Sequence, residues 1–303
     1  MSTTTAEKYR VRFRKVLEYI DVNLNENLSV TQLSKVAVFS KYHFHRQFSE
    51  FFGIGVYKYV QLRRLKRASY QLAFRSCTQV IDIALANGYE GPESFARAFR
   101  KCIGQSPSEF RKQPQWIPWY AIYQPLSELR IKHMKSTTQA EQVTIINFND
   151  TKVAVLEHRG DPQLIGNSIK TFIEWRKQHH LSPKVSATFN ILYDNPAEVA
   201  PENYRLDICA AIESDVTSNK IGIVGKTIPS GRYAVLRHIG SDDALGERIR
   251  YLYSEWLPQS GEKPRDFPIF LQRVKFFPDV PENEAITDVF LALCETSNLL
   301  GLE

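Results

Sequence analysis

Apolar residues recur at every third or fourth position through residues 9–111, the spacing that places them on one face of an α-helix. Proline, which interrupts helices, is absent from this half until Pro92. We therefore predict an all-α first half. From residue 143 onward, short runs rich in β-branched and aromatic residues alternate with two helical stretches, which predicts an α+β second half. The expected strands are residues 143–148, 153–156, 205–212, 233–238 and 286–293.

A proline-containing aromatic segment separates the two halves. Residues 113–142 hold three prolines, two tryptophans and two tyrosines, followed by a polar run at 136–141. We interpret this segment as a linker whose aromatic residues dock on one of the domains. The predicted organisation is a domain at 1–112, the linker at 113–142 and a domain at 143–303.

The second half contains an internal duplication. The pattern Ala-Val-Leu-x-His-x-Gly occupies residues 154–160 and recurs 80 positions later at 234–240. Further pairs are Pro201-Glu202-Asn203 with Pro281-Glu282-Asn283 at offset 80, Glu174-Trp175 with Glu255-Trp256 at offset 81, and Asp207 with Asp288 at offset 81. Each copy has the order strand, helix, strand, strand. We therefore predict duplicated βαββ units with a cleft along a pseudo-twofold axis.

The first half is duplicated as well. Phe44, Arg46, Phe48 and Gly53 recur 51 positions later as Phe95, Arg97, Phe99 and Gly104. Ser29, Ser40 and Thr78 precede helical runs and are the expected N-caps. Each copy is thus predicted to be a helix, a short turn and a second helix, which is a helix-turn-helix unit.

The second helix of each unit has one apolar face. If Phe44 and Phe48 face the core, Tyr42, His45 and Arg46 face outward near the helix start, where a recognition helix contacts the major groove of DNA. The corresponding outward residues of the second unit are Glu93, Ser94, Ala96 and Arg97.

A long helix is expected between the two units, because Leu62, Leu65 and Leu72 lie on one stripe. A helix of about 18 residues spans roughly 27 Å, close to one turn of DNA at about 34 Å. One chain is therefore predicted to contact two successive major grooves, without needing a palindromic site. Two interpretations stay open for the basic residues of this helix, a solvated face or phosphate contacts; they are Arg63, Arg64, Lys66 and Arg67.

The net charge of +6 is divided unevenly. Residues 1–112 hold 19 Lys and Arg against nine Asp and Glu, a net charge of +10, whereas the remainder holds 20 against 24, a net charge of −4. DNA, RNA or an anionic membrane surface is therefore the expected partner of the first half alone. The four cysteines show no disulfide or zinc spacing, and no apolar stretch approaches the roughly 18 residues of a membrane helix. We expect a cytoplasmic protein with no metal, cofactor or membrane partner.

The first half resembles the AraC-type transcriptional regulators over about residues 16–111, including the closing Gly-Gln-Ser-Pro-Ser-Glu-Phe-Arg at 104–111. The resemblance implies a bacterial-type regulator that binds double-stranded DNA at a promoter beside RNA polymerase, more often as an activator. It also places base contacts on the outward residues named above and on Pro92. Pro92 cannot hydrogen-bond a base edge, and Glu93 favours the N4 donor of cytosine.

The predicted DNA-binding residues are grouped on the two recognition helices. Lys41, Arg100 and Lys101 adjoin them and are expected to contact phosphates. The full set is Ser40, Lys41, Tyr42, His45, Arg46 and Gln47 in the first unit, and Glu93, Ser94, Arg97, Arg100 and Lys101 in the second.

Residues 143–293 resemble the GyrI-like effector-binding domain, which accompanies AraC-type units in regulators of Rob-like architecture. The resemblance implies a small-molecule pocket between the repeats. Aromatic residues on repeat-related elements suit a planar apolar or amphipathic ligand, and core packing is the alternative explanation. Gln272 falls where some relatives have a buried glutamate, which argues against a preference for cations. The predicted effector-binding residues are Trp175, Tyr193, Tyr233, Tyr253, Trp256, Phe270 and Gln272.

Other functions of the second domain stay open. No nucleophile elbow, HExxH motif or phosphate-binding loop is present, so no catalytic residue is predicted and a hydrolase is the less favoured alternative. A protein-interaction or dimerisation module is the other alternative. His158 and His238, related by the repeat, are either ligand contacts or polar residues at strand ends.

Overall fold

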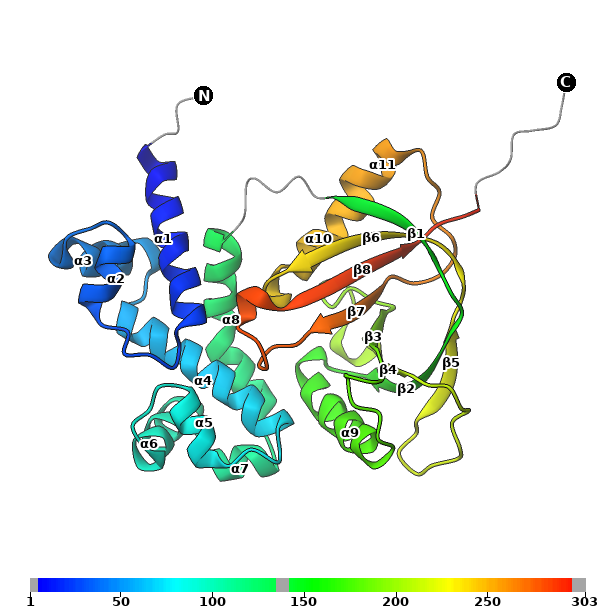
Figure 1. The fold of residues 1–303 in the computed structure, drawn as a ribbon, viewed down its shortest axis with the longest axis horizontal. Coiled ribbons are helices and arrows are strands. Elements are labelled where there is room, and N and C mark those ends of the chain that lie inside the picture. Colours follow the sequence, from blue (N-terminus) through cyan, green and yellow to red (C-terminus); the bar gives the residue numbers. More distant parts are fainter. Residues whose placement is uncertain (1–4, 135–141, 296–303) are drawn as a thin grey trace, which may run out of the picture. The chain divides into compact units, whose positions relative to one another are not determined.

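The computed structural model describes residues 5–134 and 142–295, so the polar run predicted at 136–141 lies outside the described residues. The chain divides into two compact units. One contains Met1–Thr138 together with Phe277–Glu284 and is called the helical unit; the other contains Gln139–Phe276 with Ala285–Glu303 and is called the sheet unit. The predicted architecture, an all-α part and an α+β part, is confirmed (Figure 1).

The helical unit is built from eight α-helices among the described residues. They are α1 (Thr5–Val22), α2 (Val30–Val36), α3 (Lys41–Phe52), α4 (Val56–Phe74), α5 (Val80–Ala86), α6 (Pro92–Ile103), α7 (Pro107–Lys112) and α8 (Trp116–Met134). Ser29 and Ser40 cap α2 and α3 as predicted, because each hydroxyl accepts a hydrogen bond from a backbone N–H three residues ahead. The expected cap at Thr78 is wrong: α5 begins two residues later, with Gln79 at its N-cap and no side-chain cap.

The segment predicted as a linker contains helix α8. Trp116, Trp119 and Tyr123 are buried, and Trp116 contacts Phe110 of α7 edge-on at 5.5 Å between ring centroids. The aromatic residues of this segment therefore dock within the helical unit.

The sheet unit contains one antiparallel sheet of eight strands, in the order β1-β6-β8-β7-β3-β4-β2-β5 (Figure 1). The strands are β1 (Val143–Phe148), β2 (Thr151–Arg159), β3 (Thr188–Leu192), β4 (Arg205–Ala211), β5 (Val224–Ile228), β6 (Gly231–Ile239), β7 (Phe270–Lys275) and β8 (Ile286–Ala292). Short 3₁₀ turns lie at Pro162–Leu164, Pro201–Asn203, Asp242–Ala244 and Glu282–Glu284. The helices are α9 (Ile165–Gln178), α10 (Leu245–Tyr251), the π-helix η4 (Leu252–Trp256) and α11 (Leu257–Ser260).

The sheet has the predicted twofold pseudo-symmetry. Its two central strands, β3 and β7, pair so that Phe189 faces Gln272 and Ile191 faces Phe270. These two pairs exchange under the repeat offset of 81, and the Asn190–Leu271 pair between them lies on the axis. The outer strands are exchanged between the copies, because β1 pairs with β6 and β5 pairs with β2. Each copy is therefore a βαββ unit preceded by one strand, and that strand pairs with the first strand of the other copy.

The π-helix η4 corresponds to a difference between the two copies. The repeat offset is 80 at the His158/His238 strand and 81 at Trp175/Trp256, so the second copy has one extra residue between these points. A π-turn takes up one more residue than an α-turn. The extra residue is thus accommodated within the helix η4, and the flanking elements keep their equivalent positions.

Candidate nucleic-acid interface and sheet face

Helix α3 presents a polar face opposite a buried one. Phe44 and Phe48 are fully buried, so His45 and Arg46 between them point away from the core. Tyr42 is 88% exposed, and His45 and Arg46 are exposed as well. The helix ends at Gly53, whose φ of 68° is left-handed and whose N–H donates to the carbonyl of Ser49.

Helix α6 repeats this construction residue by residue. It has the same length of 12 residues as α3, buries Phe95 and Phe99, and ends at Gly104 with a φ of 84°. The N–H of Gly104 donates to the carbonyl of Arg100, which is 51 positions after Ser49. Arg97 is exposed at the position equivalent to Arg46. The two helices are therefore buried and capped alike, and each exposes an arginine at the same position.

Helix α4 connects the two helix-turn-helix units and is the long helix predicted from the sequence. Its 19 residues correspond to roughly 28 Å at about 1.5 Å per residue. Leu62, Leu65 and Leu72 are buried as expected.

For Arg63 and Lys66 on α4, both interpretations, a solvated face and phosphate contacts, are wrong. Arg63 and Lys66 are 1% and 5% exposed, and each pairs with a buried carboxylate. Arg64 donates to the backbone carbonyls of Leu24 and Glu26. These cations satisfy groups of the protein itself, and burial lowers the pKa of the Arg64 guanidinium.

The predicted DNA-binding residues differ in exposure. Two are half-buried: the hydroxyl of Ser94 donates to the carbonyl of Gly91, and the side-chain oxygen of Gln47 is shielded from solvent. Arg100 lies 3.7 Å from the carboxylate of Glu109, although both side chains are well exposed. The exposed members are Ser40, Lys41, Tyr42, His45, Arg46, Glu93, Arg97, Arg100 and Lys101. Among the described residues, neither Arg46 nor Arg97 hydrogen-bonds another side chain, so both guanidinium groups are available.

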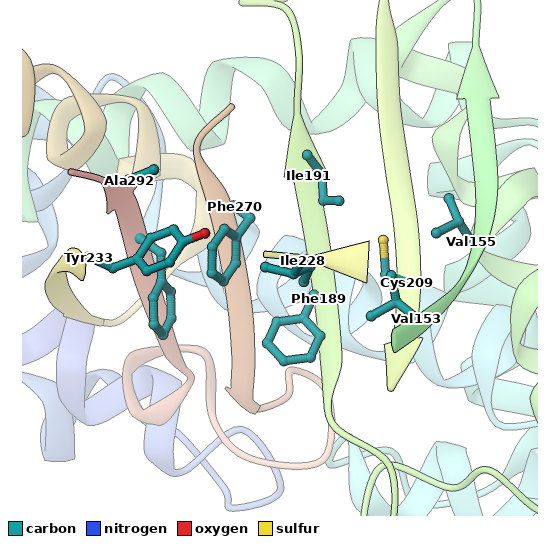
Figure 2. Packing of buried hydrophobic residues seen from close by; sticks show 10 residues of the cluster. Val153, Val155, Phe189, Ile191, Cys209, Ile228, Tyr233, Phe270 and Ala292 are labelled. Atoms are coloured by element: carbon teal, nitrogen blue, oxygen red, sulfur yellow. The ribbon is translucent and has the colours of Figure 1, made fainter. Parts of the chain in front are cut away.

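One face of the sheet is covered by helices and the other is lined by aromatic rings. Trp175 of α9 packs with Ala154 and Leu156, whereas the alternate residues Val153 and Val155 belong to a cluster on the opposite face. Figure 2 shows this second cluster, in which Tyr233 and Phe270 lie side by side with ring centroids 5.3 Å apart. Phe148, Phe189 and Phe290 complete the group of rings, here called the aromatic face.

The structure does not bring the seven predicted effector-binding residues together. Tyr233 and Phe270 lie in the aromatic face, and strand alternation places Gln272 and Tyr193 on that same side. Trp175 and Trp256 pack in the helix-covered clusters, where core packing accounts for them. Tyr253 lies on the π-helix and is 45% exposed.

A charged group that sequence reasoning missed borders the aromatic face. Asp207 is fully buried, Glu157 faces it across the β2–β4 pair, and the ammonium group of Lys226 lies 2.7 Å and 2.6 Å from their carboxylates. The Tyr193 hydroxyl donates to Asp207, and the Arg205 guanidinium lies 3.8 Å from the Tyr193 ring centroid. The repeat marked Asp207, but the position equivalent to Glu157 in the second copy is Arg237, which pairs with Asp288. The similarity of the copies around Asp207 and Asp288 therefore did not indicate that Asp207 faces a carboxylate where Asp288 faces a guanidinium group.

The two repeat-related histidines are polar residues that fix turns at strand ends. His158 is 5% exposed, and its ring nitrogens contact the Ser168 hydroxyl at 2.9 Å and the Asp161 carbonyl at 3.2 Å. His238 contacts the Ser241 carbonyl at 2.8 Å in the same way. Burial lowers the pKa of His158, which favours the neutral form of its ring.

Neither a membrane span nor a metal site is found within residues 5–134 and 142–295. No helix there has the length and apolar character needed to cross a membrane. Within the same ranges, no three His, Cys, Asp or Glu side chains are placed to hold a metal ion together.

These features define a helix-turn-helix DNA-binding protein with a second, duplicated α+β domain. Residues 33–113 match the family described as a helix-turn-helix domain. Residues 141–293, just over half of the chain, match the GyrI-like small molecule binding domain, and the chain belongs to this family. It is therefore a transcriptional regulator of the AraC type that carries a GyrI-like domain.

Relatives in bacteria are similar to parts of the chain. The probable transcriptional regulator YgiV of Escherichia coli K12 is 40% identical over 50% of this chain and 95% of its own length. The right origin-binding protein of the same organism is 30% identical over 49% of this chain and 51% of its own. The uncharacterized HTH-type transcriptional regulator YbfP of Bacillus subtilis is 36% identical over 34% of this chain and 35% of its own.

Two solved structures are similar to one part each. The C-terminal domain of EcmrR aligns with 52% of this chain and 100% of its own, at 15% identity and a TM-score of 0.43. The DNA-binding domain of AdpA in complex with a target DNA aligns with 33% of this chain and 94% of its own, at 26% identity and a TM-score of 0.31.

Proposed function

We propose that this protein activates transcription from promoters where its two recognition helices contact two successive major grooves on one face of the DNA. The observation that carries the proposal is the equivalence of α3 and α6. Both have 12 residues, bury a Phe pair four residues apart and expose an arginine between them. Helix α4, about 28 Å long, joins the two helix-turn-helix units. This length suits a spacing of the recognition helices near one DNA turn of about 34 Å.

The charge of the first part supports the same function. Exposed cations of residues 1–112 attract the phosphate backbone, among them Lys41, Arg100 and Lys101 beside the recognition helices. A promoter-bound activator works in the cytoplasm with RNA polymerase as its partner, and the protein needs no catalytic group for this role.

The second part of the proposal is regulation by a small apolar or amphipathic molecule bound in the GyrI-like domain. The aromatic face is the favoured place, because its rings, which are buried against one another, lie on both repeats, and no helix within residues 5–134 and 142–295 belongs to this cluster. Titration of candidate ligands against tryptophan fluorescence distinguishes the alternatives. Saturable quenching supports an effector site and turnover supports a hydrolase. Neither result is expected of a protein-interaction module.

The DNA proposal is tested by selecting bound duplexes from a random pool with the unsubstituted chain and with Arg46→Ala and Arg97→Ala. Each substitution is expected to weaken binding to the selected site by about 1–3 kcal/mol and to relax a different block of bases. Lys152→Ala, which removes an exposed cation of the sheet unit, is the matched control and should change nothing. Identical selected sequences for both arginine variants would contradict the proposal.

A further inference from the structure

The connection between β7 and β8 belongs to the helical unit, although both strands belong to the sheet unit. This segment, Phe277–Glu284, contacts helix α4 and the C-cap residue that follows it. The Phe277 ring lies 5.2 Å from the Tyr70 ring, the Asp279 carboxylate accepts hydrogen bonds from Arg75, and Glu282 pairs with Arg63 and Lys66.

Glu282 lies in a buried ion cluster made of Asp21, Arg63, Lys66, Arg130 and Glu282. One Glu282 oxygen accepts from the Lys66 ammonium group at 2.9 Å, and the other faces the guanidinium groups of Arg63 and Arg130. Asp21 lies 2.9 Å from Arg63 and 2.6 Å from Arg130. None of the five residues is more than 5% exposed.

The charges of this cluster depend on Glu282. Three cations face two carboxylates, so removal of Glu282 leaves Asp21 alone with three buried cations. Removing one member of a buried ion cluster leaves uncompensated charge, which is strongly unfavourable. Burial by itself raises the pKa of the Glu282 carboxyl, but the charges of Arg63, Lys66 and Arg130 outweigh it and hold the pKa well below its usual value.

The repeat supplies an internal comparison. Pro201-Glu202-Asn203 and Pro281-Glu282-Asn283 are the same tripeptide at equivalent positions, and each forms part of a 3₁₀ turn or borders one. Glu202 is exposed, whereas Glu282 is 5% exposed and surrounded by cations from α4 and α8. The turn itself therefore does not require a buried carboxylate. The difference is that Glu282 pairs with cations of the helical unit.

We propose that Glu282 is a positioning residue for DNA binding, which fixes helix α4 and links its state to that of strands β7 and β8. The inference rests on the proposed function, because α4 sets the separation of the two recognition helices. Phe277 follows β7 after one intervening residue, and Ala285 directly precedes β8. Those strands carry Phe270 and Phe290, whose rings stack at 4.5 Å in the aromatic face. A change there is passed along the chain to both ends of the segment.

The test compares Glu282→Gln with Glu202→Gln in the full chain. Two duplexes are used, one with both selected blocks at their selected spacing and one with the first block alone. Glu282→Gln is expected to lower affinity for the two-block duplex by about tenfold and to leave the one-block duplex unchanged, because only the former requires a fixed α4. Glu202→Gln should affect neither.

Rescue and coupling complete the test. Lys66→Gln added to Glu282→Gln removes one of the three buried cations and should restore part of the lost affinity. Amide exchange is the second readout: binding of the two-block duplex should slow exchange in β7 and β8 of the unsubstituted chain and of Glu202→Gln, but not of Glu282→Gln, since coupling between sites is reciprocal.

The possible failures are distinguishable. If the unsubstituted chain selects no two-block site, the proposed function itself is contradicted. Equal weakening of both duplexes by Glu282→Gln without rescue shows that Glu282 only supports folding, and overturns the positioning role. Unchanged exchange in β7 and β8 on DNA binding overturns the link to the sheet.

Discussion

At the scale of single residues, the buried and half-buried ion groups do not contain equal numbers of cations and carboxylates. Glu157 illustrates this, because three cations surround one half-buried carboxylate. Its hydrogen bond from Lys226, opposed by partial burial and assisted by Arg159 and Arg205, lowers its pKa to about 2. In the unfolded chain the same group titrates near 4.3.

The sign of the resulting pH dependence follows from that lowered pKa. The folded state keeps Glu157 charged at a pH where the unfolded chain protonates it, so its contribution is complete above pH of about 5 and is lost as the pH falls toward about 2. Amide exchange in β2 and β4, measured over this range, should accelerate as the pH falls once the intrinsic exchange rate is divided out.

Glu157→Gln should show part of this loss already at neutral pH and a shallower dependence below pH 5. Glu213→Gln, which alters an exposed carboxyl of the same unit, serves as control and should keep the original profile. A Glu157→Gln profile parallel to that of the unsubstituted chain would show that the ion group does not stabilise this end of the sheet.

Exposure can be predicted from the sequence where the surroundings of a residue are repeated, and not where its partner is remote, while the DNA contacts themselves stay a prediction. Arg46 and Arg97 were identified from their spacing relative to buried phenylalanines, and both are exposed. Arg63 and Lys66 were assigned to the surface because charged residues are rarely buried. Their partner Glu282 lies more than 200 positions away, and nothing in local periodicity indicates such a pairing.

At the scale of elements, the two helix-turn-helix turns share one geometry but use different residues. In each turn a backbone N–H donates to a carbonyl five residues earlier, Phe39 to Ser34 and Tyr89 to Ala84. The residue before each donor has a positive φ: Gly88 at 71° and Val38 at 55°. A left-handed conformation is unfavourable for a β-branched residue by about 1–2 kcal/mol, so the first turn is strained where the second is not.

Val38→Asn is therefore expected to raise the free energy of unfolding of the helical unit by about 1 kcal/mol, because asparagine adopts this conformation more readily. Val38 is 70% exposed, so little packing is lost. Chemical denaturation followed by amide exchange in α2 and α3 measures the change. Val185→Asn, at an exposed valine with ordinary φ, is the control for loss of an exposed side chain. A decrease in stability for Val38→Asn would contradict the strain.

At this scale the sequence predicts the long helix α4 but not the position of the π-helix. The long helix α4 follows from periodicity, and the repeated glycines at 53 and 104 lie at the C-caps of the recognition helices. The π-helix is visible in the sequence only as a change of repeat offset from 80 to 81, which does not say where the extra residue is taken up. The Thr78 cap failed because a serine or threonine before a helix is a preference and not a requirement.

At the scale of the whole molecule, the division into units is not a division of the sequence at one point. The helical unit takes up α8 and the eight residues Phe277–Glu284, so it includes acidic residues from the acidic remainder of the chain. The charge split between residues 1–112 and the rest therefore described the sequence and not the folded units. A fragment ending at residue 112 lacks Arg130 and Glu282, two members of the buried ion cluster.

The central claim is that one chain places two recognition helices in successive major grooves. Hydroxyl-radical footprinting of the full chain on its selected duplex tests this most directly. The account predicts two protected patches on one face of the DNA, about 10 base pairs apart, with Arg46→Ala weakening one patch and Arg97→Ala the other. A single protected patch, or the loss of both patches from either substitution alone, would contradict it.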